Sequence, residues 1–125
     1  MHFKKHYTRD EARELLPQVR GWLGEVQALR DELARQEVRV ASLMQAGHDI
    51  GGNTVNIWLK TFADMRVILN EFNTREIQIK DLDRGLVDFP AIVQGREVFL
   101  CWEQGEEDIE FWHDLEAGYP GRERL

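Results

Sequence analysis

Apolar residues in the first third of the chain recur at alternating steps of four and three, the spacing that places them on one face of an α-helix. Only Gln36 interrupts this series. Thr8, followed three residues later by Glu11, forms a capping box in which each side chain can bond a free backbone amide at a helix start. The pattern predicts a first helix over residues 8–46 with an apolar seam of Leu15, Val19, Trp22, Val26, Leu29, Leu33, Val40 and Leu43.

A second apolar series follows a glycine-rich linker at residues 47–52, where paired glycines favour a turn over a helix. Asn53 or Thr54 can cap a helix at this point. The series then continues at the same spacing through Val55, Trp58, Phe62, Met65, Leu69, Phe72 and Ile79, interrupted once at Glu76. We therefore predict a second helix over residues 54–80. Two helices joined by a short linker pack antiparallel, which gives a coiled-coil-like α-helical hairpin.

The last third of the chain has the pattern of short β-strands. Two runs rich in β-branched and aromatic residues, GLVDFPAIV and REVFLCW, flank Gln94-Gly95, an arrangement typical of a hairpin with a tight turn. A second turn signal, QGE, precedes the run DIEFWHD. Residues 86–114 are therefore predicted to form a small three-stranded antiparallel β-meander.

The unequal lengths of the two helices predict where the strands pack. The first helix would be roughly 55 Å long and the second roughly 40 Å, at about 1.5 Å per residue. The start of the first helix then has no helical partner and exposes Leu15, Leu16 and Val19. Because three short strands cannot fold alone, we expect the meander to cover this segment. The predicted fold class is α+β, a single domain over residues 1–125 that ends in a C-terminal tail at 115–125.

Composition and charge exclude several classes of function. The net charge is −7, and the one basic cluster is a short stretch near the N-terminus, so we expect no nucleic-acid binding. No run approaches the roughly 18 apolar residues of a membrane span, and the N-terminus lacks the apolar core of a signal peptide. One cysteine excludes an intramolecular disulfide and a cysteine-rich zinc site. We expect a cytoplasmic protein that does not bind membranes.

The sequence also resembles a known family. Residues 80–102, KDLDRGLVDFPAIVQGREVFLCW, and residues 105–122, GEEDIEFWHDLEAGYPGR, are similar to the C-terminal signature of a family of small bacterial proteins known as domain of unknown function 2203. The segment YTRDEARELLPQV near the N-terminus also fits the opening of that family. The resemblance spans nearly the whole chain and implies a bacterial source, but it implies no activity, substrate or catalytic residue.

The candidate site lies in the predicted meander. Alternation along DIEFWHD places Ile109, Phe111 and His113 on one face, so the imidazole is either a buried core group or part of a site. In the first case a backbone carbonyl or a carboxylate, Asp88 or Glu106, would satisfy it. In the second case the wall of a small polar ligand-binding pocket would be formed by Trp102, Glu106, Trp112 and His113.

We expect no catalytic residue, no metal site and no cofactor. The spacing of Glu110 and His113 matches the E-x-x-H motif of di-iron proteins, but that motif needs a helix, and a strand puts the two side chains on opposite faces. Cys101 is expected to be a small apolar filler, because nothing near it in sequence would lower its pKa.

Two classes of function remain open. The first is a non-enzymatic interaction or scaffold module, because the apolar stripe on the helices, flanked by Leu16, Leu23, Met44, Leu59 and Ile68, is wider than one seam buries. Pairing of two hairpins into a four-helix bundle would give a homodimer. The second is a small-ligand- or metal-binding protein, or an enzyme, with its pocket around His113. We favour the first class.

Overall fold

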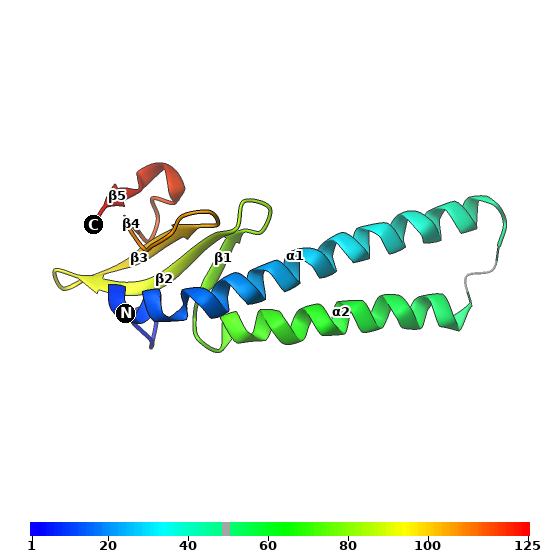
Figure 1. Ribbon diagram of the computed structural model, residues 1–125, viewed down its shortest axis with the longest axis horizontal. Helices are drawn as coiled ribbons and strands as arrows, with labels where there is room; N and C mark the ends of the chain where they lie inside the picture. The colour runs from blue at the N-terminus through cyan, green and yellow to red at the C-terminus, as the bar shows by residue number, and fades with distance from the viewer. Residues whose placement is uncertain (49–50) are drawn as a thin grey trace.

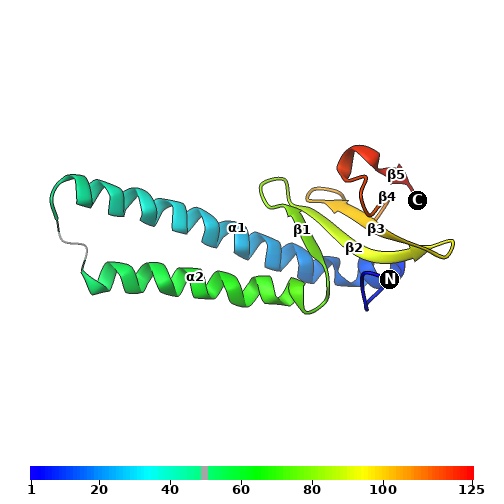
Figure 2. The same cartoon turned by 180° about the vertical axis from the view of Figure 1, so that it is seen from behind.

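The computed structural model describes residues 1–48 and 51–125 as two long helices followed by an antiparallel sheet, an α+β fold (Figure 1). The two residues left out fall in the predicted linker. The helices extend well beyond the sheet, which lies at one end of the molecule (Figures 1 and 2). The elements are α1 (Arg9–Gln45), α2 (Gly52–Asn73), β1 (Gln78–Asp81), β2 (Leu86–Val93), β3 (Arg96–Glu103), β4 (Phe111–Asp114), the 3₁₀ turn η1 (Tyr119–Gly121) and β5 (Glu123–Arg124).

Helix α1 begins as the sequence predicts. Thr8 is its N-cap, and both hydrogen bonds of the capping box with Glu11 are present. Pro17 lies inside the helix without ending it. Gly47, at the far end, has a φ of +79°, a left-handed conformation that glycine adopts without steric cost. The predicted bounds of the first helix are therefore correct to within one residue at each end.

Helix α2 ends at Asn73, so the prediction that it continues to Lys80 was wrong. Glu76, the polar interruption in the apolar series, has a φ of +58°, and this left-handed residue turns the chain out of the helix. Ile77 follows and is buried, and β1 begins one residue later. Ile79, which continued the helical series, therefore lies in a strand.

The sheet has five strands in the order β1-β2-β3-β4-β5, each antiparallel to its neighbour, not the three that we predicted. The additional strands are the two edges, β1 and β5. Strand β1 replaces the expected last turns of α2, and β5 is formed by the C-terminal segment that we predicted only as a tail. Strands of two to four residues are too short to show a period in the sequence, and pairing with a neighbour defines them.

The core joins the first half of α1 to one face of the sheet. Leu16, Val19 and Leu23 are almost completely buried, and they pack in one cluster with residues of β2 and β3 such as Phe89 and Leu100. The expectation that strands cover the start of the first helix is confirmed. Leu16 and Leu23, however, belong to this core and not to the outer stripe to which we assigned them.

The two helices lie side by side in both views (Figures 1 and 2). Near the sheet, the ring of Trp22 on α1 meets Phe72 on α2 edge to face, at 5.7 Å between ring centres. Farther out, Gln36 donates a hydrogen bond from its side-chain nitrogen to Oγ1 of Thr61 at 3.0 Å. Beyond that pair, no residue of the described part of α1 is buried.

Candidate functional site

The sheet has two buried faces with different chemistry. Along β2, Val87 and Phe89 point into the core with α1, so Asp88 and Pro90 point to the other side. All four are buried. The nearly continuous run of apolar residues around Asp88, in place of an alternation of apolar and polar residues, was the signal in the sequence that this second face is covered as well.

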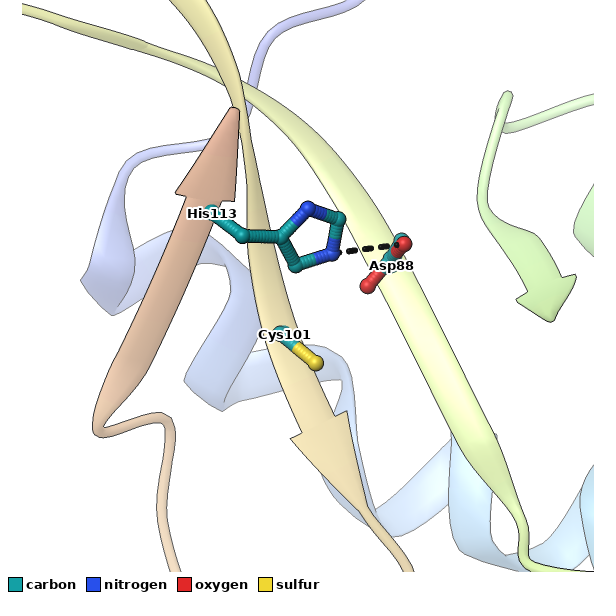
Figure 3. Close-up of side chains that lie close together, drawn as sticks. All are labelled: Asp88, Cys101 and His113. Atoms are coloured by element: carbon teal, nitrogen blue, oxygen red, sulfur yellow. Dashed lines mark hydrogen bonds and ion pairs between the residues drawn. The ribbon is translucent and has the colours of Figure 1, made fainter. Parts of the chain in front are cut away.

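Three polar side chains meet on this second face. Asp88 on β2 and Cys101 on β3 are direct cross-strand partners. His113 on β4 is paired with Phe99, one step along the same face of β3, so it lies diagonally across from Cys101. Figure 3 shows the three side chains converging from the three strands. One ligand atom from each, a carboxylate oxygen, the thiol sulfur and a ring nitrogen, all lie within 4.8 Å of one another.

The ring of His113 is fixed by two hydrogen-bond partners. Its Nε2 lies 3.0 Å from Oδ2 of Asp88, and its Nδ1 lies 2.7 Å from the backbone oxygen of Asp114. A carbonyl oxygen can only accept, so Nδ1 carries a proton and donates it. The contact between Nε2 and Oδ2 then contains a single further proton, held by the imidazole or by the carboxyl group. In either case the pair has no net charge.

Burial controls the protonation of the cluster. It raises the pKa of Asp88, an effect that the charge and hydrogen bond of His113 oppose in part. Burial also raises the pKa of the Cys101 thiol to about 12, and the nearby carboxylate of Asp88 adds to this shift. The thiol therefore stays protonated at neutral pH. This agrees with the expectation that Cys101 does not act as a nucleophile on its own.

One atom of the cluster lacks a hydrogen-bond partner. Oδ1 of Asp88 is buried, and none of the described residues donates a hydrogen bond to it. A weak hydrogen-bond interaction with the Cys101 thiol lowers the pKa of the carboxyl group, but no hydrogen bond of standard geometry reaches Oδ1. A buried carboxylate oxygen without a donor is costly and uncommon in folded proteins.

The C-terminal segment covers the neighbourhood of Cys101. Arg122 lies over the ring of Phe111, the cross-strand partner of Cys101, with 3.8 Å between the guanidinium carbon and the ring centre. The guanidinium also donates two hydrogen bonds to the carboxylate of Glu106, at 2.7 and 2.9 Å. The pair is partly buried, and its charges act on the Cys101 thiol with opposite signs.

The structure does not bring the four residues of the predicted pocket together. Trp102 is fully buried on the core face, where its Nε1 donates to the backbone oxygen of Glu106. Trp112 alternates with His113 along β4 and faces the same side as Trp102, away from the imidazole. Their role in ligand binding stays a prediction.

The structure bears out one part of the sequence interpretation and changes two others. Asp88 and a backbone carbonyl, both expected as partners for a buried imidazole, do bond His113. Ile109 was expected to share the face of His113, but it lies before β4 begins and packs into the core with α1. The involvement of Cys101 was missed, because a diagonal contact depends on strand register, which the sequence does not give.

The described distal part of the two helices forms a second surface of interest, which we call the helical arm (residues 34–45 and 52–67). A groove of about 290 Å³ runs between α1 and α2 there, and Val40, Met44, Val55 and Trp58 supply most of its apolar wall. Trp58 stacks on Phe62, which extends this apolar surface along α2. Leu59 is half exposed beside them.

Comparison with known proteins gives a family without a known activity. The model of a family described as an uncharacterized conserved protein matches residues 5–125. Searches of curated proteins and of solved structures found no match. No helix among the described residues is both long enough and apolar enough to cross a membrane. Because the family model covers nearly the whole chain, the protein belongs to the uncharacterized conserved protein family DUF2203.

Proposed function

We propose that this protein is a non-enzymatic interaction or scaffold module that forms a homodimer through its helical arm. The observation that carries the proposal is the apolar surface of the arm, which no other part of the described chain covers. We define the docking face as Val40, Met44, Val55, Trp58, Leu59 and Phe62, all of them half-buried or exposed.

The position of these residues supports a single continuous face. Val55, Leu59 and Phe62 follow one another at steps of four and three along α2, and Val40 and Met44 are four apart on α1. Both rows border the same groove. Packing this face against its copy around a two-fold axis would extend the predicted coiled-coil seam into a four-helix bundle.

The distribution of charge supports a second copy as the partner. The arm carries four basic residues, Arg35, Arg39, Lys60 and Arg66, and two acidic ones, Glu37 and Asp64, so its net charge is +2. The chain as a whole has a net charge of −7, so the remaining residues carry −9. Among contacts that join the same part of both copies, a contact between the two arms therefore brings the least like charge together.

A cytoplasmic location is supported by the single cysteine, which is buried and forms no disulfide.

Sedimentation equilibrium at micromolar concentration tests the proposal. We expect a mass of twice the 14.7 kDa of one chain. Leu59→Glu and Phe62→Glu should shift it to one chain, because each places a charge within the docking face.

Val38→Glu and Val67→Glu are the matched controls. Both valines are about 70% exposed on the arm. At roughly 100° per residue, Val38 lies about 120–160° around α1 from Val40 and Met44, and Val67 lies about 140° around α2 from Phe62, so both point away from most of the docking face. They should leave the dimer intact. A single-chain mass for the unsubstituted protein would overturn the proposal, and so would equal effects of the control and docking-face variants.

A further inference from the structure

The cluster of Asp88, Cys101 and His113 has the chemistry of a metal site. It offers one oxygen, one sulfur and one nitrogen ligand from three neighbouring strands. We propose that these three side chains bind a divalent transition-metal ion of the zinc type. This goes beyond the interaction role proposed above, and it departs from our expectation that the chain has no metal site.

The spacing of the donor atoms fits a tetrahedral ion. Zinc binds oxygen and nitrogen at about 2.0–2.2 Å and sulfur at about 2.3 Å, so the ligand atoms of one tetrahedral ion lie about 3.3–3.8 Å apart. The three donor atoms of the cluster already lie within 4.8 Å of one another. Binding of the ion would require side-chain rotations that bring the three donor atoms to these separations and open the 3.0 Å contact between Nε2 and Oδ2.

An independent observation points to a ligand in the same place. Oδ1 of Asp88 is buried and without a donor, although the residue is only 1% exposed. An ion bound between the carboxylate and the thiol would satisfy this oxygen. The cost of leaving it without a partner would then be specific to the metal-free protein.

The orientation of the histidine is that of a metal ligand. Histidines that bind metals usually donate their second ring N–H to a carboxylate or a backbone carbonyl, which fixes the ring and its tautomer. Nδ1 of His113 makes this bond to the oxygen of Asp114 at 2.7 Å. Nε2, the remaining nitrogen, faces Asp88 and the cluster, and it would coordinate the ion once the proton that it shares with Asp88 is released.

The charges balance when the ion binds. In the metal-free protein the thiol is neutral, and Asp88 and His113 share one proton with no net charge. A divalent ion would displace the thiol proton and the shared proton to solvent, leaving a thiolate, a carboxylate and a neutral imidazole around it. The buried net charge is zero in both states, so binding adds no uncompensated charge to the interior.

The set of ligands selects the class of metal. A thiolate and an imidazole favour zinc and similar transition metals over magnesium and calcium, which prefer oxygen ligands alone. Three protein ligands leave a fourth position for water or an anionic ligand, as in zinc sites that are not fully closed by protein.

Cobalt titration of the full chain tests the site, because Co²⁺ reports zinc-type coordination in its absorption spectrum. The chain has one cysteine, so a thiolate-to-cobalt charge-transfer band can come only from Cys101. We expect such a band to saturate at one equivalent of Co²⁺ and to disappear when Zn²⁺ is added. Because the site is buried, the titration is repeated with Co²⁺ present during refolding from urea.

Variants distinguish Co²⁺ binding at the buried cluster from Co²⁺ binding at carboxylates on the surface. Cys101→Ala should abolish the band, and Asp88→Asn should weaken Co²⁺ binding by at least about tenfold. Glu110→Gln is the matched control, since this partly exposed carboxylate three residues before His113 pairs with Arg124 and lies outside the cluster. It should bind Co²⁺ as the unsubstituted protein does.

Melting temperature provides a second measurement for each variant. One equivalent of Zn²⁺ should raise it in the unsubstituted protein and in Glu110→Gln, and leave it unchanged in Cys101→Ala. Absence of the charge-transfer band after both titration and refolding would overturn the proposal. Zinc stabilisation that survives in Cys101→Ala would also overturn it, because the ion would then bind elsewhere.

Discussion

The buried pair of Asp88 and His113 allows a quantitative prediction for the metal-free protein. The two residues are only 1% and 2% exposed, and the contact between them is 3.0 Å. In His113→Leu the carboxyl group of Asp88 keeps no partner on Oδ2, and Oδ1 already has none. Leaving one member of a buried charged pair without its partner costs about 3–5 kcal/mol, and we expect a loss of this size in the free energy of unfolding.

The opposite substitution should cost less. In Asp88→Ala the imidazole keeps its Nδ1 hydrogen bond to a backbone carbonyl, and only one neutral acceptor, Nε2, loses its partner. An unsatisfied neutral group costs about 1–3 kcal/mol. The double variant removes both polar groups, so it should be more stable than His113→Leu alone, with a coupling energy of about 2 kcal/mol.

Urea unfolding in the presence of EDTA, followed by tryptophan fluorescence, measures these energies. The slope of the unfolding free energy against urea concentration should be equal in the unsubstituted protein, the two single variants and the double variant. Equal slopes show that the same amount of surface becomes exposed on unfolding. Additivity of the two single substitutions to within about 0.5 kcal/mol would refute the reasoning. Additivity would mean that the two side chains do not stabilise each other in the folded state.

The same variants predict a dependence on pH. Burial raises the pKa of Asp88, and His113→Leu removes the charge and hydrogen bond that lower it. When a folded-state pKa is above its unfolded value, the group's contribution is most favourable below the unfolded pKa and is lost as the pH rises through the folded pKa. The cost of His113→Leu should therefore be smaller at about pH 5 than at about pH 8. An unchanged cost would contradict this assignment.

Three further substitutions test other parts of the fold. Gln36→Leu should raise the free energy of unfolding by about 1 kcal/mol in urea, because Oε1 of this buried side chain has no partner while the hydroxyl of Thr61 keeps a backbone acceptor; a loss would contradict this. Gly85→Ala should destabilise more than Gly95→Ala in thermal melts: both glycines have a positive φ, but only at the first would a Cβ lie 2.5 Å from a neighbouring Cβ. Burial raises the pKa of Glu97, but hydrogen bonds from one imidazole and two backbone amides lower it to about 2. Since a depressed carboxyl pKa stabilises at neutral pH and this contribution is lost as the pH falls through that value, Glu97→Gln should lower the melting temperature at pH 7 and not near pH 2.

The helices could be predicted because their signals are long and local. Thr8 and Glu11 set the start of α1 through a capping box, and the apolar period predicted the rest of that helix. The two polar interruptions had different causes that the sequence does not distinguish. Gln36 stays helical and bonds Thr61 on α2, whereas Glu76 adopts a left-handed conformation and ends the helical run. Both appear in the series as one polar residue at an apolar position.

The strands show where periodicity stops being informative. Alternation correctly predicted that Phe111 and His113 share a face, and composition suggested Asp88 as a partner for the imidazole. Alternation failed for Ile109, because β4 begins only at Phe111 and the preceding residues do not keep the two-residue period. The cluster with Cys101 depends on the register between β2, β3 and β4, a property of strand pairs that no single strand shows.

The two proposals concern separate parts of the molecule, the sheet and the arm, which meet different physical requirements. The sheet is buried on one side by α1, and its other side encloses a polar cluster whose members compensate one another's charges. The arm extends away from the sheet, where its two helices have only each other to pack against (Figure 1). The apolar docking face on this arm is the basis for our proposal of a partner. The metal cluster needs no such partner, since all three of its ligands come from one sheet.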